Sequence, residues 1–256
     1  MPDPIEIRRD GAIATVLLNR PDRMNALNLD MWRGLSRAFQ TLAADPSLRA
    51  VVLRGAGTQA FAPGADISEF DTDRATAAQA EAYDRVMREA LAMVRDCPHP
   101  VVAMIHGACV GGGLELAAQA DLRISGQSGR FGVPVGRISV VMAPPEIAGI
   151  QRLVGPARMA EILLEARVFD AAEALSIGLL HRVVADDQLE DEIAATVKRI
   201  TANAPLVNRW HKAFVRAAAE GAPVDTGEAY RFLSTADYAE GIAAFKEKRK
   251  PAFVGA

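Results

Sequence analysis

Two glycine-rich turns, each lying between a short β-branched run and a helix-like stretch, constrain this chain more than any other feature. They occupy residues 61–67 and 106–115. Glycine lets the backbone turn sharply and lets a ligand approach main-chain amides without a Cβ in the way. If the N–H groups of Ala65 and Gly112 converge, they form a pair of donors suited to a developing oxyanion, with the Glu115 carboxylate beside them.

The order of strand, turn and helix repeats along the first half of the chain. Two paired strands are predicted around an Asp-Gly turn, and Asn28 is predicted to cap the first helix, which ends before Asp45. From about residue 145 the pattern is almost wholly helical. The sequence therefore predicts an α/β body followed by a helical C-terminal part. The predicted strands are residues 5–9, 13–19, 50–54, 101–105 and 122–125, and the predicted helices are residues 75–96, a segment from about 113, 188–203 and 207–219.

Composition excludes several classes of protein. The 256 residues, half of them apolar, suffice for one large core, and a net charge of -3 gives no general attraction for nucleic acid or an anionic membrane. No segment reads as a signal peptide or a membrane span, so a cytoplasmic location is expected. The two cysteines have no metal-binding spacing, so neither a metal site nor a disulfide framework is predicted.

The glycine-rich turns also have simpler interpretations. Each one alone could be a tight connection without chemistry. A triple-glycine turn could cradle a phosphate, but no Gly-Lys-Ser/Thr follows it and the Rossmann spacing is absent. Nucleotide-phosphate binding at these turns is therefore disfavoured.

Five segments follow one another over nearly the whole chain, at residues 19–27, 61–67, 105–116, 169–180 and 245–251. Together they resemble the enoyl-CoA hydratase/isomerase (crotonase) superfamily. The resemblance implies an α/β fold built as a spiral of repeated ββα units. It implies a core at residues 1–195 with an acyl-CoA site, and a helical C-terminal oligomerisation region at residues 196–256 that trimerises. A homotrimer or a hexamer made of two trimers is expected, with no permanently bound cofactor and with coenzyme A entering as part of the substrate.

The family's binding residues can be carried over onto matching positions. The amides of Ala65 and Gly112 match the oxyanion hole that holds the thioester oxygen of an acyl-CoA. A basic C-terminal segment that includes Lys248 matches residues that often reach the CoA phosphates, sometimes from a neighbouring subunit, although it could also be a solvated tail. The acyl-CoA contacts implied are Arg23, Ala26, Leu27, Ala65, Asp66, Ile67, Ser68, Gly112, Val135 and Lys248, and the basic segment also contains Lys246, Arg249 and Lys250.

Glu115 matches the first of the two catalytic glutamates of the family's hydratases. Beside a bound thioester it can position water or move a proton at the α or β carbon, provided that desolvation raises its pKa toward neutrality. The alternative is a glutamate that only interacts with the dipole of its own helix. By the same resemblance His106 is a packing residue, and Glu69 could face either solvent or the groove.

Val135 departs from the family pattern. Hydratases of the family generally carry Glu at this position, and an isopropyl group can neither accept nor donate a proton. Two-glutamate hydration therefore cannot operate here as usually drawn. Glu146 is one candidate for the missing carboxylate, although a glutamate after Pro144 and Pro145 is also favoured simply as an N-terminal helix residue.

Several functions remain open at this stage. The first is an enoyl-CoA hydratase or isomerase that uses Glu115 as acid/base. The second is other CoA-thioester chemistry on the same oxyanion hole, namely hydrolysis, decarboxylation or carbon–carbon cleavage. The third is a non-catalytic acyl-CoA binder. Single-acid isomerases of the family tend to keep their acid at the position of Val135, which argues against simple isomerisation, and retention of Glu115 argues against a pure binder.

Overall fold

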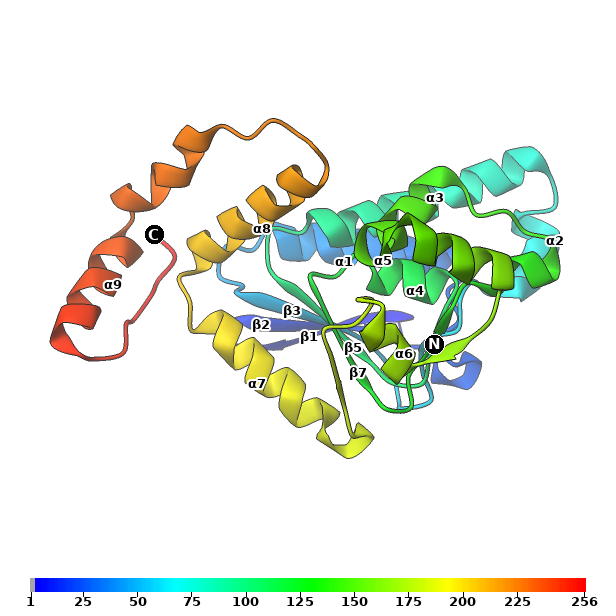
Figure 1. The fold of residues 1–256 in the computed structure, drawn as a ribbon, viewed down its shortest axis with the longest axis horizontal. Helices are drawn as coiled ribbons and strands as arrows, with labels where there is room; N and C mark the ends of the chain where they lie inside the picture. The colour runs from blue at the N-terminus through cyan, green and yellow to red at the C-terminus, as the bar shows by residue number, and fades with distance from the viewer. Residues whose placement is uncertain (1–2) are drawn as a thin grey trace.

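The computed structural model describes residues 3–256, which form two β-sheets covered by helices (Figure 1). The larger sheet has the order β1-β2-β3-β5-β7-β10, and only its β1–β2 hairpin is antiparallel. The smaller sheet has the order β4-β6-β8-β9. The strands are β1 (Ile5–Asp10), β2 (Ile13–Leu18), β3 (Ala50–Gly55), β4 (Ala60–Ala62), β5 (Val101–Ile105), β6 (Ala108–Val110), β7 (Leu122–Gly126), β8 (Arg130–Gly132), β9 (Phe169–Asp170) and β10 (Arg182–Val184).

The expected ββα repeat is visible in how the chain alternates between the sheets. β3, β5 and β7 lie side by side in the large sheet, and each is followed by a short strand, β4, β6 or β8, in the small sheet. Helices α2 (Phe70–Asp73) and α3 (Ala77–Asp96) follow the first pair, α4 (Gly112–Ala117) follows the second, and α5 (Pro144–Glu165) follows the third. The predicted α/β fold class with repeated ββα units is therefore confirmed.

Apolar side chains cover both faces of the large sheet. On one face α1 (Leu29–Ala43) and α3 pack over residues such as Leu53 and Ile105, with Trp32 and Phe39 fully buried between them. On the other face α7 (Leu189–Thr201) covers a second cluster that includes Met104 (Figure 1). Each fully buried side chain of this size stabilises the fold by about 1.5–3 kcal/mol relative to exposure.

Local capping explains where the helices of the first half begin. The Asn28 side chain accepts a hydrogen bond from the Met31 amide at 3.0 Å, as predicted for the start of α1. Thr76 and Gln79 form a reciprocal capping box at the start of α3. Both helices lie beside the glycine-rich turns, so these caps fix the frame on which the turns are held.

The C-terminal half departs from the prediction in two details. It is not almost wholly helical, because β9 and β10 interrupt the helices α5, α6 (Ala171–Ser176) and α7. Strands of two or three residues are too short to show an alternating pattern, which is why they and the short strands of the small sheet were missed. The division at residue 195 falls inside α7. The next helix, α8 (Pro205–Ala219), stays against the body, where Lys212 donates to the His99 carbonyl at 3.0 Å, and α9 (Ala236–Glu247) lies away from the sheets (Figure 1). Within residues 3–256 no helix is long and apolar enough to cross a membrane.

Candidate active site

The two glycine-rich turns meet, and their amides lie close together. Leu27 donates to the Gly64 carbonyl at 2.8 Å and accepts from the Asp66 amide at 2.9 Å. Successive N–H groups of an extended segment point to opposite sides, so the Ala65 N–H faces away from Leu27. A Cβ built on Gly112 would lie 3.6 Å from the Ala65 nitrogen. Within the described chain neither of these two amides donates to a protein acceptor.

Two glycines make this approach possible. Gly64 has a φ of +119°, a conformation that side-chain-bearing residues rarely adopt. At Gly113 a Cβ would lie 2.1 Å from the Ala62 carbonyl oxygen, so α4 could not pack against β4 with any larger residue there. The second turn therefore needs glycine for packing, and the first needs it for its backbone conformation.

A cavity of about 300 Å³ opens beside the paired amides. Its wall brings together five of the predicted site residues and adds charged and apolar residues that were not predicted. The five are Ala65, Ile67, Gly112, Glu115 and Val135, and the additions include Phe70, Arg74, Asp84, Met87, Arg137, Ile138 and Met142. Val135 lies in a short 3-10 helix, η3 (Pro134–Ile138), and presents an apolar side chain to the cavity that Glu115 also lines.

The Glu115 carboxyl is buried and lacks a partner. The residue is only 6% exposed, and its Oε2 atom has no hydrogen-bond partner within residues 3–256. Desolvation, followed by the nearby carboxylates of Glu146 and Asp84, raises the pKa of Glu115 to about 8, although Arg74 acts in the opposite direction. A proton therefore stays on this side chain at neutral pH.

Glu146 is as buried as Glu115, but both of its carboxylate oxygens are occupied. Oε1 accepts a hydrogen bond from Nε of Arg88 at 2.7 Å, and Oε2 accepts one from the Ala143 amide at 2.7 Å. The second contact satisfies a free donor at the start of α5. The interpretation of Glu146 as an N-terminal helix residue therefore fits the structure better than a free catalytic carboxylate.

A chain of ion pairs leads from Glu146 along one wall of the cavity. Arg88 lies 3.6 Å from Asp84, whose Oδ1 atom lies 2.8 Å from Arg74. The Arg74 guanidinium also stacks on the rings of Phe70 and Tyr83, at 5.1 and 4.9 Å from their centroids. Sequence reasoning missed these charges because they belong to no motif. The one available signal was the spacing of Asp84 and Arg88, which places them on one face of the predicted helix.

The loop before α1 supports the first turn from behind. Leu27 is fully buried in the core, so it aligns Ala65 through the backbone and has no surface for a ligand. The Asp66 carboxylate pairs with Arg20 at 3.0 Å and accepts the Ser68 hydroxyl at 2.6 Å. Of the remaining predicted contacts in this region, Arg23 and Ala26 lie on the loop itself, and neither they nor Asp66 and Ser68 line the cavity.

Asn25 holds that loop in place and was missed from the sequence. It is fully buried with a φ of +64°, a conformation that asparagine tolerates better than most residues. Its Nδ2 donates to the carbonyls of Ala56 and Ala60 at 3.0 and 2.9 Å, and its Oδ1 accepts from the Arg20 amide at 3.1 Å. The sequence feature that could have indicated this role is an asparagine in a turn that contains proline, because asparagine tolerates positive φ.

Glu69 supports the beginning of α1. Its Oε2 accepts a hydrogen bond from the Leu29 amide at 2.9 Å. The Glu69 carboxylate therefore faces the start of α1, and Glu69 does not line the cavity.

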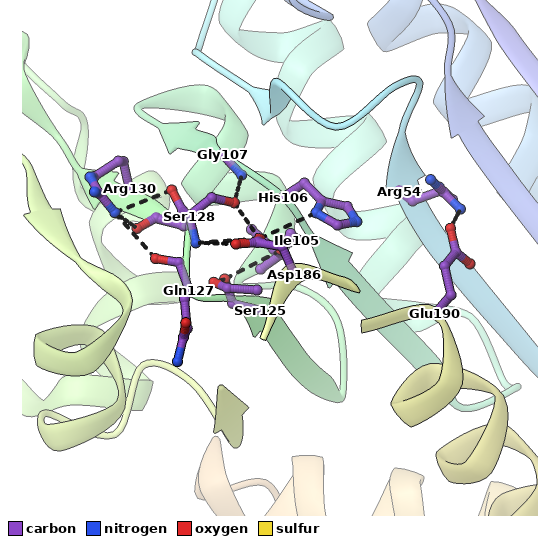
Figure 2. A network of polar contacts seen from close by, with 12 residues as sticks. Arg54, Ile105, His106, Gly107, Ser125, Gln127, Ser128, Arg130, Asp186 and Glu190 are labelled. Atoms are coloured by element: carbon purple, nitrogen blue, oxygen red, sulfur yellow. Dashed lines mark hydrogen bonds and ion pairs between the residues drawn. The ribbon is translucent and has the colours of Figure 1, made fainter. Parts of the chain in front are cut away.

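His106 belongs to a separate polar network. Figure 2 shows its ring beside Asp186, with Nδ1 3.6 Å from the carboxylate. Asp186 accepts hydrogen bonds from the Ser128 hydroxyl and amide at 2.5 and 3.1 Å, and the Ser128 hydroxyl in turn accepts from the Gly107 amide at 3.2 Å. These contacts connect the turns after β5 and β7 to the segment after β10. His106 does not line the cavity, in keeping with its interpretation as a packing residue.

The structure separates the basic C-terminal segment from the cavity. Lys248 ends α9, which lies at the opposite end of the molecule from α2 and the start of α5 (Figure 1). Arg249 is engaged with Glu240 at 2.6 Å. Within one chain, therefore, Lys248 does not reach the paired amides, and its assignment to the acyl-CoA site requires a neighbouring copy.

The two sheets and their repeated ββα units are the architecture of crotonase-fold structures. The chain belongs to the enoyl-CoA hydratase/isomerase family, whose model matches residues 8–256.

Individual relatives agree with this assignment. The crotonyl-CoA hydratase of Syntrophomonas wolfei is 32% identical, over 98% of this chain and 97% of its own length. Among solved structures, an enoyl-CoA hydratase/carnithine racemase from Magnetospirillum magneticum is 62% identical with a TM-score of 0.97, covering 99% of this chain and 96% of that one. An enoyl-CoA hydratase from Bacillus anthracis is 29% identical with a TM-score of 0.91, covering 98% of this chain and 99% of that one.

Proposed function

We propose that this protein is an acyl-CoA enzyme of the hydratase/isomerase type that transfers protons at the carbons next to a thioester. One observation carries the proposal: a single cavity contains the two unengaged amides of Ala65 and Gly112 and the unpartnered carboxyl of Glu115. The amides are suited to the thioester oxygen, and the carboxyl is suited to a proton on the adjacent carbon.

The amides act on the charge that develops during the reaction. When a nucleophile adds to the β carbon of a 2-enoyl thioester, the electron pair of the double bond moves toward the thioester oxygen and forms an enolate. Donors already fixed by the backbone stabilise that oxygen without reorganisation, and one such donor typically contributes about 3–4 kcal/mol. The hydrogen bonds that Leu27 donates to the Gly64 carbonyl and accepts from the Asp66 amide keep the Ala65 amide in this orientation.

Glu115 supplies the proton that the enolate needs. Because burial raises the pKa of Glu115 to about 8, the side chain is protonated at neutral pH. It donates this proton to the α carbon, and the proton released by the attacking water restores the acid. Overall, one water adds across the double bond and Glu115 is regenerated.

Val135 favours a second class of reaction as the alternative. Because no carboxylate occupies that position, chemistry that needs an oxyanion hole and one acid is compatible with the same cavity. This class contains thioester hydrolysis, decarboxylation and carbon–carbon cleavage, and a non-catalytic acyl-CoA binder would keep only the groove.

The decisive experiment is mass spectrometry of a trans-2-enoyl-CoA incubated with the protein in heavy water, beside the Glu115→Gln variant. The proposal predicts a gain of one water, with one deuterium on the α carbon, that depends on Glu115. Deuterium incorporation without hydration would identify isomerase-type proton transfer. An unchanged thioester that still binds would contradict hydratase activity and favour the alternative class.

We also propose that the C-terminal helices assemble the protein into a homotrimer or a hexamer. Large apolar side chains of this region lie uncovered in the single chain, with Phe245 85% and Val254 72% exposed. Burying such residues against a second copy would also bring a basic segment containing Lys248 toward a neighbouring chain. Light scattering of the purified protein tests the assembly, and a monomer would contradict it.

A further inference from the structure

Hydration needs a group that takes a proton from water, and Val135 leaves that position apolar. Three carboxyl groups line the cavity: Glu115, Glu146 and Asp84. Glu115 already holds a proton in the proposed function, on which this inference rests. Both oxygens of Glu146 are occupied by Arg88 and by the Ala143 amide. Asp84 is the carboxylate that remains.

Asp84 faces the cavity from α3, across from α4. Its side chain is 17% exposed, and its buried Oδ1 lies 2.8 Å from Arg74 without accepting a well-aligned hydrogen bond from the described residues. We propose that Asp84 is the second proton-transfer residue of this site, accepting a proton from the attacking water while Glu115 donates one to the α carbon.

The surroundings of the two carboxyl groups suit opposite roles. Asp84 is flanked by two cations, Arg74 at 2.8 Å and Arg88 at 3.6 Å, which favour its ionised form. Desolvation and Glu146 act against them and raise the pKa of Asp84. Glu115 has no ion pair within the described chain and keeps its proton. Two carboxyl groups in one cavity with different surroundings, one flanked by cations and one without an ion pair in the described chain, are the pattern of a base and an acid.

The proposed step balances in protons and electrons. Water attacks the β carbon and forms the carbon–oxygen bond, and its proton passes to the Asp84 carboxylate. The electron pair of the double bond reaches the thioester oxygen and then returns to the α carbon, which takes the proton of Glu115. Transfer of the proton from Asp84 to Glu115, directly or through solvent, restores the starting state.

The test is the pH profile of kcat/KM for hydration of a trans-2-enoyl-CoA. The wild-type profile should be bell-shaped, with an acid limb from Asp84 and an alkaline limb near pH 8 from Glu115. Asp84→Asn should lower kcat by about 10²–10⁴-fold, and the residual activity should lack the acid limb. Its affinity for a saturated acyl-CoA should stay within about twofold of wild type, a difference of about 0.4 kcal/mol.

Two further variants keep the result interpretable. Asp121→Asn removes a carboxylate that pairs with Lys212 at 2.7 Å outside the cavity, and it should retain both limbs. Arg74→Gln removes the cation beside Asp84 and should shift the acid limb to higher pH, even if Asp84→Asn fails to fold. If Asp84 had only a structural role, Asp84→Asn would keep the acid limb and Arg74→Gln would leave it at the wild-type pH. That result overturns the inference. If Glu115→Gln is fully active, the proposed function fails; if Glu115→Gln is inactive and Asp84→Asn keeps the acid limb, only this inference fails.

Discussion

The two ends of this molecule leave different groups without partners. At the cavity end, beside exposed apolar residues of the rim such as Val141, the buried groups without partners are polar, namely the amides of Ala65 and Gly112 and the Oε2 atom of Glu115. At the other end, on and around α9, they are large apolar side chains such as Phe245 and Val254. Buried polar groups without partners are costly, and exposed apolar surface is also unfavourable, so each end requires an explanation.

The difference separates two functions. Polar groups without partners in a small cavity are arranged for a small molecule with matching donors and acceptors. Uncovered apolar side chains on neighbouring helices are arranged for another protein surface, which we propose is a second copy of the chain. Changes at the cavity end should therefore alter turnover without altering assembly, and changes at the α9 end should act first on assembly.

The largest effect is expected for Glu115→Gln. The amide keeps the shape of the side chain but cannot give up a proton at neutral pH, so turnover should fall by about 10²–10⁴-fold. Affinity for a saturated acyl-CoA should stay nearly intact, because the paired amides and the cavity wall are unchanged. Steady-state kinetics and isothermal titration calorimetry measure the two quantities. Equal turnover in the variant would remove Glu115 from the mechanism.

The second-largest effect is expected for Ala65→Pro. Proline removes the N–H that we propose binds the thioester oxygen, at a cost on the order of 3 kcal/mol in transition-state stabilisation. The measurement is kcat/KM, with circular dichroism as the control for folding damage. A variant that is folded and retains kcat/KM would show that this amide does not face the reacting oxygen.

Glu115→Gln should also change stability, in a direction set by linkage. Burial raises the pKa of Glu115 from its ordinary value of 4.5 to about 8, so between these pH values the folded chain holds a proton that the unfolded chain has released. The free energy of unfolding of the wild type therefore falls as pH rises through this window, by an amount on the order of a few kcal/mol. The free energy of unfolding of the variant should lack this pH dependence, and its gain over the wild type should be largest above pH 8. Thermal melts at several pH values measure it, and parallel curves would contradict it.

Glu146→Gln should change stability in the opposite direction. Its carboxylate is already partnered by Arg88 and the start of α5, so neutralising it should destabilise the fold by about 1–3 kcal/mol. Urea denaturation at neutral pH measures the loss. A stabilised variant would show that Glu146, like Glu115, is a carboxyl group whose burial destabilises the fold despite its contacts.

Phe245→Ser should give the smallest change in chemistry and should act on assembly. Replacing an exposed phenylalanine should weaken association by about 1.5–3 kcal/mol per chain, while kcat measured at high protein concentration should be retained. Sedimentation velocity across a dilution series reports the assembly. Unchanged association would exclude the neighbourhood of Phe245 from the interface.

Much of the cavity end could be predicted because its residues belong to contiguous motifs. The turns that contain Ala65 and Gly112, with Glu115 three residues after Gly112, are short segments whose glycines have a direct conformational reason. Asp84 and Arg74 could not be predicted in the same way. The place of Asp84 depends on which face of α3 points to α4, and that of Arg74 on how the chain turns between α2 and α3, neither of which a helical pattern reveals.

Other parts of the site required coordinates for different reasons. Leu27 matches a binding loop in sequence, but the fold buries it and uses its backbone instead. Asn25 acts through two hydrogen bonds to the carbonyls of Ala56 and Ala60, which are distant in sequence and which no local pattern shows. Lys248 shares the family's basic segment, yet only a second copy could bring it to a cavity at the other end of the molecule.

The central claim is that Glu115 carries a proton at neutral pH, and infrared difference spectroscopy tests it most directly. Spectra of wild type minus Glu115→Gln, recorded from about pH 5 to about pH 10, isolate the carboxyl of this residue across its titration. The account predicts a protonated carboxylic-acid band at pH 7 that disappears with a midpoint near pH 8. An ionised carboxylate band already complete at pH 7 would contradict it.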